Sequence, residues 1–488
     1  MSILTEARLF IDGKIRRAAD QKTYDVIGPW TGEPVGKAAD ASAQDVNEAI
    51  AAARRAFDST DWPTNQRSRL RLVQKLYELM LANSDKMALI CRHEGGSAMG
   101  AIARAQVNMA MDGYKNVLDI FPQVRWSKDY GEAGPQQYRS QRKVVYEPVG
   151  VVGAITPWNV PLYVDVGKVA PALLAGCTVI LKPAPNTPGV AALIGELAAE
   201  AGFPAGVFNV ITGSDPAMAG EMLVTDPRVD LISFTGSTAV GKRIMEKGAA
   251  TLKRVFLELG GKSAKIVLDD VPNFAQEIAS SILVFHAGQG CAVVSRLLVS
   301  RKRYPEAVEI LKQAYAGYAD KWGSFDDPSH MMGPVISKKQ MERVKGYIDL
   351  GVQEGATLLT GGKLRPDKGS GWFVEPTCFV DVTNDMRIAR EEIFGPVLVV
   401  IRYDDEEDAI RIANDSDYGL SGAVSSGDLQ HALKIANRIR SGSISVNGGM
   451  CIAGDLPFGG YKSSGIGREW GVEGIEEFLE SKVIAWRV

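Results

Sequence analysis

The sequence predicts an α/β protein made of two domains in tandem, each with a parallel sheet. Its 488 residues exceed the roughly 250–300 at which a single hydrophobic core stops growing. Two stretches alternate short apolar strands with Ala- and Gly-rich helices, one from Val151 onward and one from Ala264 to about Val446. Such alternation is typical of sheets covered by helices on both faces. Gly260 and Gly261 end a strand between the two series, and we expect the domain boundary there.

Ahead of the first series, the residue pattern predicts a hairpin followed by amphipathic helices. Asp12-Gly13 stands between apolar residues and favours a tight hairpin turn. Ser42, followed three residues later by Asp45, is a variant of the capping box and predicts a helix that continues to Phe57. Two further helices are expected, from about Gln66 to Ser84 and from Ala101 to Phe121.

The first α/β series contains four apolar stretches that we predict as strands: Val151–Ile155, Thr178–Leu181, Phe208–Ile211 and Leu231–Thr235. The second series contains helices such as Pro305–Ala319 and Lys338–Gly351. No internal repeat or low-complexity linker separates the two series, so we expect a tight cleft between the domains. Such clefts are favoured places for ligand sites.

The charge balance argues against a nucleic-acid partner. The chain has 55 Lys and Arg against 58 Asp and Glu, and no charge run is long enough to act as a tail. No stretch approaches the ~20 uninterrupted apolar residues of a membrane span. Residues 1–13 lack the apolar core of a signal peptide. We therefore expect a cytoplasmic protein without nucleic-acid or membrane contacts.

The cysteine and histidine patterns argue against a disulfide framework and against a metal site. The 5 cysteines are widely scattered, odd in number and without a CxxC pair. The 4 histidines are far apart and lack the spacing of metal ligands on a helix. We expect a protein of a reducing compartment that holds no metal ion.

A strand, a glycine turn and the start of a helix follow one another between Leu231 and Lys242, an arrangement that suits a phosphate site. Gly236 permits the tight turn, Gly241 lets the helix pack closely on the sheet, and Ser237 lies at the helix N-terminus. The second glycine of G-x-G-x-x-G is absent, so an ordinary turn between strand and helix remains the alternative.

Two polar residues lie at or just beyond the ends of predicted strands, at the edge where α/β sheets bind ligands. Lys182 could donate hydrogen bonds to ribose hydroxyls, although a surface lysine is the alternative. Asn159 offers an amide N–H₂ that could stabilise an oxyanion, and capping of the following helix is its alternative role.

Cys291 is the candidate nucleophile. It follows a Gly-rich turn and has small neighbours, which permit close approach of a substrate; a buried, inert thiol is the alternative. Glu258 lies inside an apolar strand between Leu257 and Leu259. Desolvation raises the pKa of a carboxyl group there and makes it a base near neutral pH. A structural ion pair with Lys262 is the alternative for Glu258.

Six short motifs resemble those of the aldehyde dehydrogenase superfamily and follow the same order along the chain. They are Pro157-Trp-Asn159, Phe234-Thr-Gly-Ser237, Leu257-Glu-Leu-Gly-Gly-Lys262, Gly288-Gln-Gly-Cys291, Glu391-Glu-Ile-Phe-Gly-Pro396 and Pro457-Phe-Gly-Gly-Tyr-Lys462. The resemblance is collinear from Phe10 to the C-terminus, so it covers nearly the whole chain. It implies an aldehyde dehydrogenase-like α/β fold with two Rossmann-like domains and a small β oligomerisation element.

The resemblance also implies NAD(P)-dependent oxidation of an aldehyde. Cys291 would attack the aldehyde, while Asn159 and the Cys291 backbone N–H would hold the oxyanion. Loss of hydride to the nicotinamide would leave a thioester, which water activated by Glu258 would hydrolyse. Lys168 and Glu469 match positions of a proton relay.

The cofactor residues follow from the same resemblance. Glu392 and Phe394 fall where the family holds the nicotinamide ribose and ring, and Lys182 matches a ribose-binding lysine. The implied set also contains Thr156, Pro157, Trp158, Gly213, Phe234, Gly236, Ser237, Gly241 and Leu259. Pro185 replaces a glutamate that usually accepts hydrogen bonds from the adenosine ribose, and no added Arg or Lys stands beside it. We favour NAD and keep NADP open.

The resemblance divides the chain into four parts. A dinucleotide-binding domain comprises residues 1–123 and 149–258, and a catalytic domain comprises residues 259–447. Residues 448–481 return to the cofactor domain and line the substrate entrance, and residues 124–148 and 482–488 form the oligomerisation element. A strand from Lys482 to Trp486 would be an open sheet edge in a monomer, so a homo-oligomer, either dimer or tetramer, is expected.

Alignment with the family places six apolar residues at the substrate entrance: Met111, Val160, Tyr163, Met450, Ile452 and Phe458. They predict a hydrophobic aldehyde, either medium-chain, aromatic or terpenoid, and simple core packing is the alternative. Gly167 stands where some semialdehyde-oxidising relatives carry an arginine, which argues against carboxylate-bearing substrates.

Two other functions stay open at this point. An acylating enzyme would pass the thioester to coenzyme A, but its relatives usually lack a glutamate at position 258. A binding or structural protein could keep the fold without the chemistry. Retention of Cys291, Glu258 and Asn159 favours an active, hydrolytic enzyme.

Overall fold

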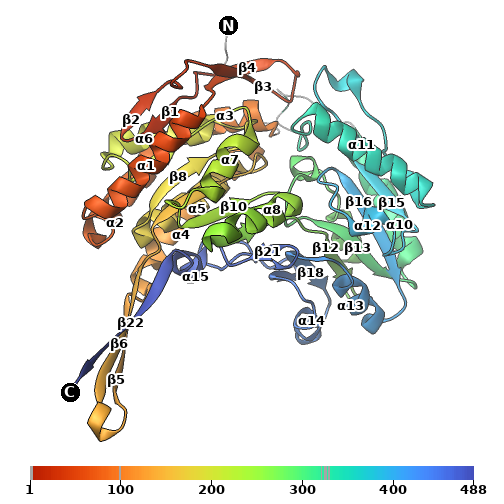
Figure 1. The fold of residues 1–488 in the computed structure, drawn as a ribbon. Coiled ribbons are helices and arrows are strands. Elements are labelled where there is room, and N and C mark those ends of the chain that lie inside the picture. The colour runs from red at the N-terminus through yellow and green to blue at the C-terminus, as the bar shows by residue number, and fades with distance from the viewer. Residues whose placement is uncertain (1–3, 98–100, 320, 324–326, 328–329) are drawn as a thin grey trace.

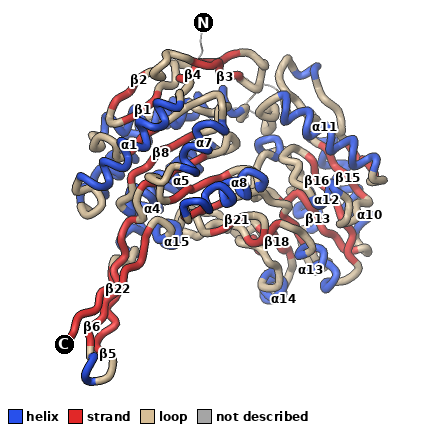
Figure 2. The backbone as a smooth tube through the Cα atoms, in the orientation of Figure 1, coloured by secondary structure: helices blue, strands red, loops and turns tan. Residues whose placement is uncertain are grey.

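Two large sheets form the centres of two domains, and a smaller sheet projects away from them (Figure 1). The structure is a computed structural model that describes residues 4–97, 101–319, 321–323, 327 and 330–488. Helices lie around the strands of both domains (Figure 2), so the predicted α/β class is confirmed.

The first domain is built on an eight-stranded sheet. Its strands are β1 Leu9–Ile11, β2 Lys14–Arg16, β7 Val151–Ile155, β8 Thr178–Lys182, β9 Phe208–Val210, β10 Leu231–Thr235, β11 Arg254–Glu258 and β21 Gly465–Ile466. They lie in the order β2-β1-β9-β8-β7-β10-β11-β21. The strands from β9 to β11 run parallel, whereas β1, β2 and β21 pair antiparallel at the edges. All four predicted strands are present.

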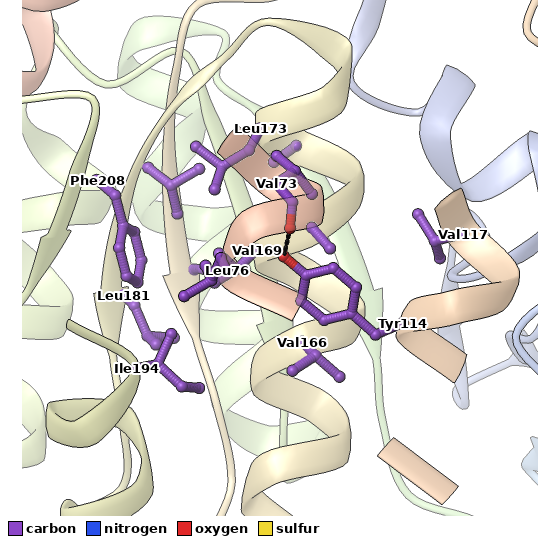
Figure 3. Close-up of a cluster of buried hydrophobic side chains, with 14 of the residues drawn as sticks. Val73, Leu76, Tyr114, Val117, Val166, Val169, Leu173, Leu181, Ile194 and Phe208 are labelled. Carbon is purple, nitrogen blue, oxygen red and sulfur yellow. Dashed lines mark hydrogen bonds between the residues drawn. The ribbon is translucent and has the colours of Figure 1, made fainter. Parts of the chain in front are cut away.

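Helices cover both faces of this sheet, and each face has its own hydrophobic core. One core is formed with α2 Gln66–Ala82, α3 Ser84–Gly95, α4 Ala101–Ile120, α5 Pro161–Ala175 and α6 Gly189–Ala201, and the other with α1 Ala43–Ser59, α7 Pro216–Thr225 and α8 Thr238–Gly248. Every residue of α5 is buried. Figure 3 shows the first core, where the Tyr114 hydroxyl donates a hydrogen bond to the Val73 carbonyl oxygen, 2.9 Å away.

The second domain is built on a seven-stranded sheet with the order β14-β15-β16-β13-β12-β18-β19. These strands are β12 Ser263–Val267, β13 Val294–Ser300, β14 Thr357–Thr360, β15 Thr377–Val380, β16 Val397–Tyr403, β18 Ser421–Ser425 and β19 Ser443–Val446, and β14 alone among them pairs antiparallel. Its helices are α9 Phe274–Ala279, α10 Tyr304–Tyr318, α11 Lys338–Gln353, α12 Arg387–Arg390, α13 Glu406–Asn414 and α14 Leu429–Ala436. Only residues 259–262 separate β11 from β12, so the two sheets meet at the glycine pair.

Three short structures complete the fold. A hairpin of β3 Thr23–Ile27 and β4 Pro34–Ala39 lies near the N-terminus, and β17 Tyr418–Gly419 pairs with β20 Tyr461–Lys462. Helix α15 Gly471–Glu476 packs against α4 and α5, so residues near the C-terminus return to the first domain. In the part of the chain that the structure describes, no helix has the length and apolar character needed to cross a bilayer.

The projecting sheet consists of β5 Ser127–Ala133, β6 Ser140–Pro148 and β22 Leu479–Arg487, in the order β22-β6-β5. It extends away from both domains in Figures 1 and 2. The predicted edge strand is confirmed within β22, which pairs with β6 along one side and leaves its other side open. Val483 and Trp486 are 72% and 48% exposed there, so this edge is apolar as well as unpaired.

Local sequence signals predicted element ends to within a few residues. The Asp12-Gly13 turn is confirmed, since both residues have positive φ angles of 54° and 74°, which the tight hairpin turn requires. Helix α1 begins after the Ser42 capping box and runs two residues beyond the predicted Phe57. The helix predicted to reach Ser84 ends at Ala82, because Asn83 caps it and a new helix begins.

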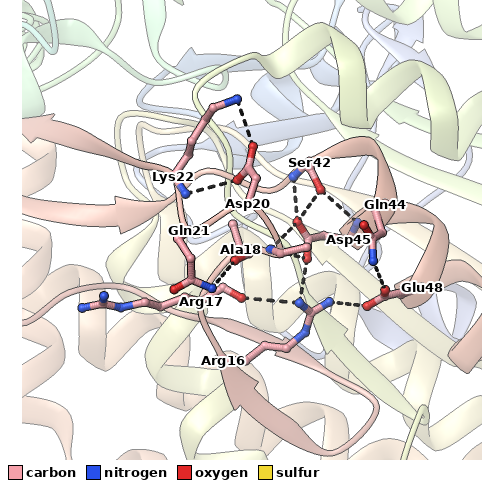
Figure 4. A network of polar contacts seen from close by, with 11 residues as sticks. Arg16, Arg17, Ala18, Asp20, Gln21, Lys22, Ser42, Gln44, Asp45 and Glu48 are labelled. Carbon is pink, nitrogen blue, oxygen red and sulfur yellow. Dashed lines mark hydrogen bonds and ion pairs between the residues drawn. The ribbon is translucent and has the colours of Figure 1, made fainter.

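The Asp45 carboxylate joins the first hairpin to α1 (Figure 4). It is fully buried and accepts hydrogen bonds from the backbone N–H of Ser42 at 2.8 Å and of Ala19 at 3.1 Å. Arg16 pairs with the same carboxylate at 2.7 Å and also contacts the exposed Glu48. A buried charge with all its partners in place is costly to disturb, because loss of one member leaves the others unsatisfied.

Replacement of Asp45 by alanine is expected to lower the free energy of unfolding by about 3 kcal/mol, because Arg16 and two backbone donors lose a buried acceptor. Glu48→Ala removes the exposed partner of the same arginine and is expected to cost less than about 1 kcal/mol. Urea unfolding followed by circular dichroism measures both. Equal losses of unfolding free energy in the two variants would show that burial of Asp45 contributes nothing to stability.

Candidate active site

Three distant segments meet in a cavity of about 310 Å³ between the two sheets. Asn159 comes from the turn between β7 and α5, Glu258 from the end of β11, and Cys291 from the loop before β13. Strand β7, which leads into the Asn159 turn, and strand β11, which ends at Glu258, lie on either side of β10 in one parallel sheet. Both side chains therefore emerge at the carboxyl edge of this sheet. The structure therefore brings together the predicted thiol, carboxylate and amide.

Cys291 is partly buried at the wall of this cavity. Burial, followed by the negative charge of Glu258 and a hydrogen bond to it, raises the pKa of the Cys291 thiol well above its usual value. Gly261 lies directly behind the loop, since a Cβ atom there would come within 2.6 Å of the Cys291 carbonyl oxygen. Cys291 is therefore a neutral thiol that lies beside the Glu258 carboxyl group.

Glu258 is 2% exposed, and one of its carboxylate oxygens has no hydrogen-bond partner among the described residues. Burial, with a smaller contribution from the charge of Glu469, raises the pKa of Glu258 to about 8. The Lys262 ammonium group also has no hydrogen-bond partner among the described residues. Burial lowers the pKa of Lys262 to about 7. The ion pair between these two residues, the alternative role of Glu258, is not formed.

Asn159 is buried and donates a hydrogen bond from its side-chain nitrogen to the Gln289 carbonyl oxygen at 3.1 Å. The residue that caps α5 is Val160, whose side chain makes no capping hydrogen bond. Helix capping, the alternative role of Asn159, is therefore not observed. Instead the amide faces the loop that carries Cys291.

A buried ion pair between Lys168 and Glu469 lies behind Glu258. Lys168 comes from the fully buried α5 and also donates to the Ser233 hydroxyl at 3.1 Å. Its ammonium group lies 4.9 Å from the centre of the Phe256 ring. Positive and negative charge are thus held together next to the buried Glu258 carboxyl group.

A second cavity of about 540 Å³ adjoins the first, because both are lined by Pro157, Trp158, Thr235 and Gly236. Thr156 and Thr235 each have a buried hydroxyl without a hydrogen-bond partner in the described part of the chain. Lys182 also lines this cavity; it is 3% exposed, and burial lowers its pKa to about 8. A surface role for Lys182 is excluded, and two joined cavities with unsatisfied donors suit a two-part polar ligand.

The turn between β10 and α8 forms the wall between the two cavities. Ser237 is the N-cap of α8, and its side chain makes no capping bond, so its hydroxyl is not committed to the helix. A Cβ atom on Gly236 would come within 2.5 Å of the Phe234 ring. A Cβ atom on Gly241 would come within 2.6 Å of Leu259, so this glycine permits close packing as predicted.

Glu392 and Phe394 reach the same cavity from the second domain. Glu392 accepts a hydrogen bond from the Gly261 backbone N–H at 3.0 Å, and a Cβ atom on Gly260 would collide with its carboxylate. Phe394 has a φ angle of 60° and lies edge-on to the Trp158 ring at 5.3 Å. The glycine pair thus permits the two domains to approach closely across the cavity.

Comparisons with known proteins agree with this geometry. Residues 16–484 match the aldehyde dehydrogenase family. The chain belongs to this family. It is 42% identical over 482 residues to the 3-succinoylsemialdehyde-pyridine dehydrogenase of a Pseudomonas species, a match that covers 97% of both chains.

Solved aldehyde dehydrogenase structures superpose on almost the whole chain. The Mycobacterium tuberculosis enzyme complexed with NAD⁺ has a TM-score of 0.92 at 42% identity and covers 99% of this chain and 98% of its own. The betaine aldehyde dehydrogenase of Staphylococcus aureus in complex with NAD⁺ has a TM-score of 0.94 at 35% identity, with coverage of 99% and 95%. The aldehyde dehydrogenase-like fold expected from the sequence is confirmed.

Sequence reasoning missed several residues that line the two cavities of this aldehyde dehydrogenase. Gln340 and Arg343 of α11 line the smaller cavity, and they donate hydrogen bonds to the Phe394 and Glu392 carbonyl oxygens at 2.8 and 2.6 Å. Arg243 and Lys247 of α8 line the larger cavity, although no cation was expected beside Pro185. Polar residues on an amphipathic helix resemble an ordinary solvated face, so no local signal distinguishes them.

Most but not all of the predicted residues line the two cavities. Those that line a cavity are Asn159, Glu258, Cys291, Thr156, Pro157, Trp158, Lys182, Phe234, Gly236, Ser237, Leu259, Glu392, Phe394 and Val160. Gly213 and Gly241 lie outside both sets of lining residues. Three predicted substrate residues belong to one hydrophobic core: Met111, Tyr163 and Phe458. Cys291 and Ile452 pack against this core. Met450 is 80% exposed. The Tyr163 ring packs on Trp470 at 4.7 Å, which places an unpredicted aromatic residue in this core.

Alkylation of Cys291 by iodoacetamide in the free enzyme is expected to be slow at pH 7 and to accelerate continuously up to pH 9, because the thiol pKa is raised. Glu258→Gln removes the neighbouring charge and is expected to increase the rate at pH 8, about tenfold for each unit by which the thiol pKa falls. Peptide mass spectrometry measures the rate, with Cys451 as an internal control in the same sample. A Cys291 rate that does not change between pH 7 and 9 would contradict the protonated resting state.

Proposed function

We propose that this enzyme oxidises an aldehyde to its carboxylic acid with NAD as hydride acceptor, through thiohemiacetal and thioester intermediates on Cys291. The observation that supports this proposal is the convergence of thiol, carboxylate and amide in one cavity that adjoins a larger cavity lined in part by Lys182 and Thr235. Thiol and carboxylate fit the two halves of such a reaction, since one group forms the acyl bond and the other helps water to break it.

The first half-reaction forms a bond from sulfur to the aldehyde carbon. Glu258 lies beside the thiol and takes its proton, so that the thiolate attacks. The Asn159 amide N–H₂ donates to the oxygen, which becomes negatively charged as the carbonyl double bond breaks. Bound NAD supplies the acceptor for the hydride, whose departure from carbon restores the carbonyl and leaves a thioester on Cys291.

The second half-reaction transfers the acyl group to water. Glu258, once it has released the thiol proton to solvent, accepts a proton from a water molecule whose oxygen attacks the thioester carbon. The bond from carbon to sulfur then breaks, the acid is released, and the leaving sulfur takes the proton back from Glu258. The buried pair of Lys168 and Glu469 lies next to Glu258 and can receive and return this proton. A pKa of about 8 suits this role, because Glu258 then gains and loses a proton near neutral pH.

The chain's own residues fit NAD. Lys182, Ser237 and the unpartnered hydroxyls of Thr156 and Thr235 supply hydrogen-bond donors around the two cavities, and Glu392 can accept from ribose hydroxyls. Arg243 is paired with Glu221 at the larger cavity, which reduces the positive charge left for an additional phosphate. This pairing, together with the NAD⁺ bound by the M. tuberculosis and S. aureus relatives, supports NAD over NADP.

The substrate we propose is a hydrophobic aldehyde of medium-chain, aromatic or terpenoid type. Val160 and Val164 line the cavity beside Cys291, and the adjoining core contains Met111, Tyr163 and Phe458. No charged side chain stands at Gly167, where Trp470 packs instead: a Cβ atom there would come within 2.7 Å of its ring. An apolar wall supports an apolar substituent on the aldehyde.

Hydrolysis is favoured over transfer to coenzyme A by Glu258, which is buried, unpaired on one oxygen and next to the thiol. A non-catalytic role is disfavoured because the thiol, the carboxylate and the amide all line the cavity. We also propose the four-part division of the chain given above, with assembly into a dimer or tetramer. The open, apolar edge of β22 supports assembly through the projecting sheet.

Glu258→Gln is expected to preserve the first turnover, because loss of the neighbouring charge lowers the pKa of the Cys291 thiol and lets it give its proton to water instead. Later turnovers are expected to slow by roughly 10²–10⁴-fold, because thioester hydrolysis loses its base. Stopped-flow absorbance of NADH would then show a burst equal to the enzyme subunits, followed by a slow phase. In the unsubstituted enzyme, steady-state kcat is expected to rise with pH through about 8, since Glu258 must be deprotonated to act.

Glu94 offers a matched control for that experiment, because burial also raises its pKa to about 8 although it lies on α3, outside both cavities. Glu94→Gln is expected to leave the pH midpoint of kcat unchanged. A Glu258→Gln enzyme that turns over normally, or a kcat that falls as the pH rises to 8, would refute the hydrolytic role.

Hexanal, decanal and benzaldehyde are expected to give kcat/KM values about tenfold or more above those of succinic semialdehyde and betaine aldehyde. Each buried CH₂ contributes about 0.8 kcal/mol to binding, whereas a charged substituent loses its hydration against the apolar wall. Initial rates of NADH formation measure these values, and Cys291→Ala should reduce all of them to background. A preference for either charged aldehyde would overturn the proposed substrate class.

A further inference from the structure

The loop that leads into Cys291 has an unusual backbone. His286, Ala287 and Gly288 have successive φ angles of 47°, 51° and 69°, so three residues in a row are left-handed. Residues other than glycine in this region cost of order 1–3 kcal/mol each and persist only where the surroundings impose the conformation. The structure around this loop must therefore hold it firmly.

Gln289 supplies the hydrogen bonds that hold the loop, and it is fully buried. Its side-chain oxygen accepts from the Ile336 backbone N–H at 2.9 Å, and its side-chain nitrogen donates to the His286 carbonyl oxygen at 3.1 Å. Its backbone N–H donates to the same carbonyl oxygen at 3.1 Å. Ile336 lies just before α11, so the side chain fastens the left-handed turn to the second domain.

The Gln289 backbone carbonyl performs a different task. It accepts the hydrogen bond from the Asn159 side-chain nitrogen at 3.1 Å. A carbonyl oxygen can only accept, so this contact requires the nitrogen of the Asn159 amide, rather than its oxygen, to face the loop. One N–H of the group is thereby fixed, and the second N–H of the same planar group is left to point elsewhere in the cavity that contains Cys291.

We propose that Gln289 is a positioning residue for the oxyanion site: its side chain fixes the loop so that its own carbonyl orients the Asn159 amide. The inference rests on the proposed function, in which Asn159 stabilises the oxyanion. The Gln289 side chain has no direct place in the chemistry, because both of its hydrogen-bonding ends are used within the protein. It acts on the reaction only through Asn159 and the loop.

A double-mutant cycle tests this inference. Asn159→Ala is expected to lower kcat by roughly 10²–10³-fold, as does removal of one oxyanion donor in other enzymes. Gln289→Ala is expected to lower kcat by about tenfold or more with the dissociation constant for NAD unchanged. Because Gln289 acts through Asn159, the double variant is expected to stay within about twofold of Asn159→Ala alone.

A matched control separates a purely structural role of Gln289 from a role in positioning Asn159. Gln106 is another buried glutamine, which accepts a hydrogen bond from the Ser97 hydroxyl at 2.9 Å and lies on α4, outside both cavities. Gln106→Ala is expected to lower the unfolding temperature without changing kcat. Gln289→Glu, which keeps the acceptor for Ile336 and the side-chain size, replaces Gln289→Ala in the cycle if the alanine variant does not fold.

The two proposals fail in different ways. If Asn159→Ala leaves kcat unchanged, the proposed oxyanion role is wrong. A second outcome is that Asn159→Ala lowers kcat and that the kcat loss in the double variant equals the product of the two single losses. Gln289 then acts independently of Asn159, and the inference alone is wrong. A weakened NAD affinity that accounts for the whole loss in the Gln289 variant would also overturn it.

Discussion

The burial of a single carboxylate, Glu258, sets the electrostatics of the candidate active site. Glu258 ends a strand that is paired on both sides, so its side chain cannot turn to solvent without disruption of the sheet. Kept from water, it has a pKa of about 8, and its charge raises the pKa of the Cys291 thiol beside it. The protonation of each group therefore depends on that of the other.

That arrangement requires support from both domains, because buried polar groups are stable only where others satisfy them. Lys168 and Glu469 form a buried pair behind Glu258, and they come from α5 and from the segment just before α15. Gly260 and Gly261 permit Glu392 and the Cys291 loop to approach β11. The junction between the two domains is tight because Gly260 and Gly261 have no side chains there.

The residues that meet in the candidate site could be predicted because their local sequence conflicts with ordinary packing. A glutamate between two leucines and a cysteine among glycines are both unusual, and a strand followed by an asparagine indicates a sheet edge. Gln289, Gln340 and Trp470 gave no such signal. Their roles depend on partners such as Ile336 and Phe394, or on the space above Gly167, and no spacing along the chain reveals those contacts.

The sequence by itself determined the α/β class, most strand positions and the nature of the reactive groups, because apolar periodicity, capping residues and glycine turns act over a few neighbouring residues. Only the tertiary structure decided the protonation of Glu258 and Cys291, the orientation of the Asn159 amide and the second cavity lined by α8. Desolvation, charge and hydrogen bonding depend on distances between atoms, and these distances are set when segments far apart in the chain pack together.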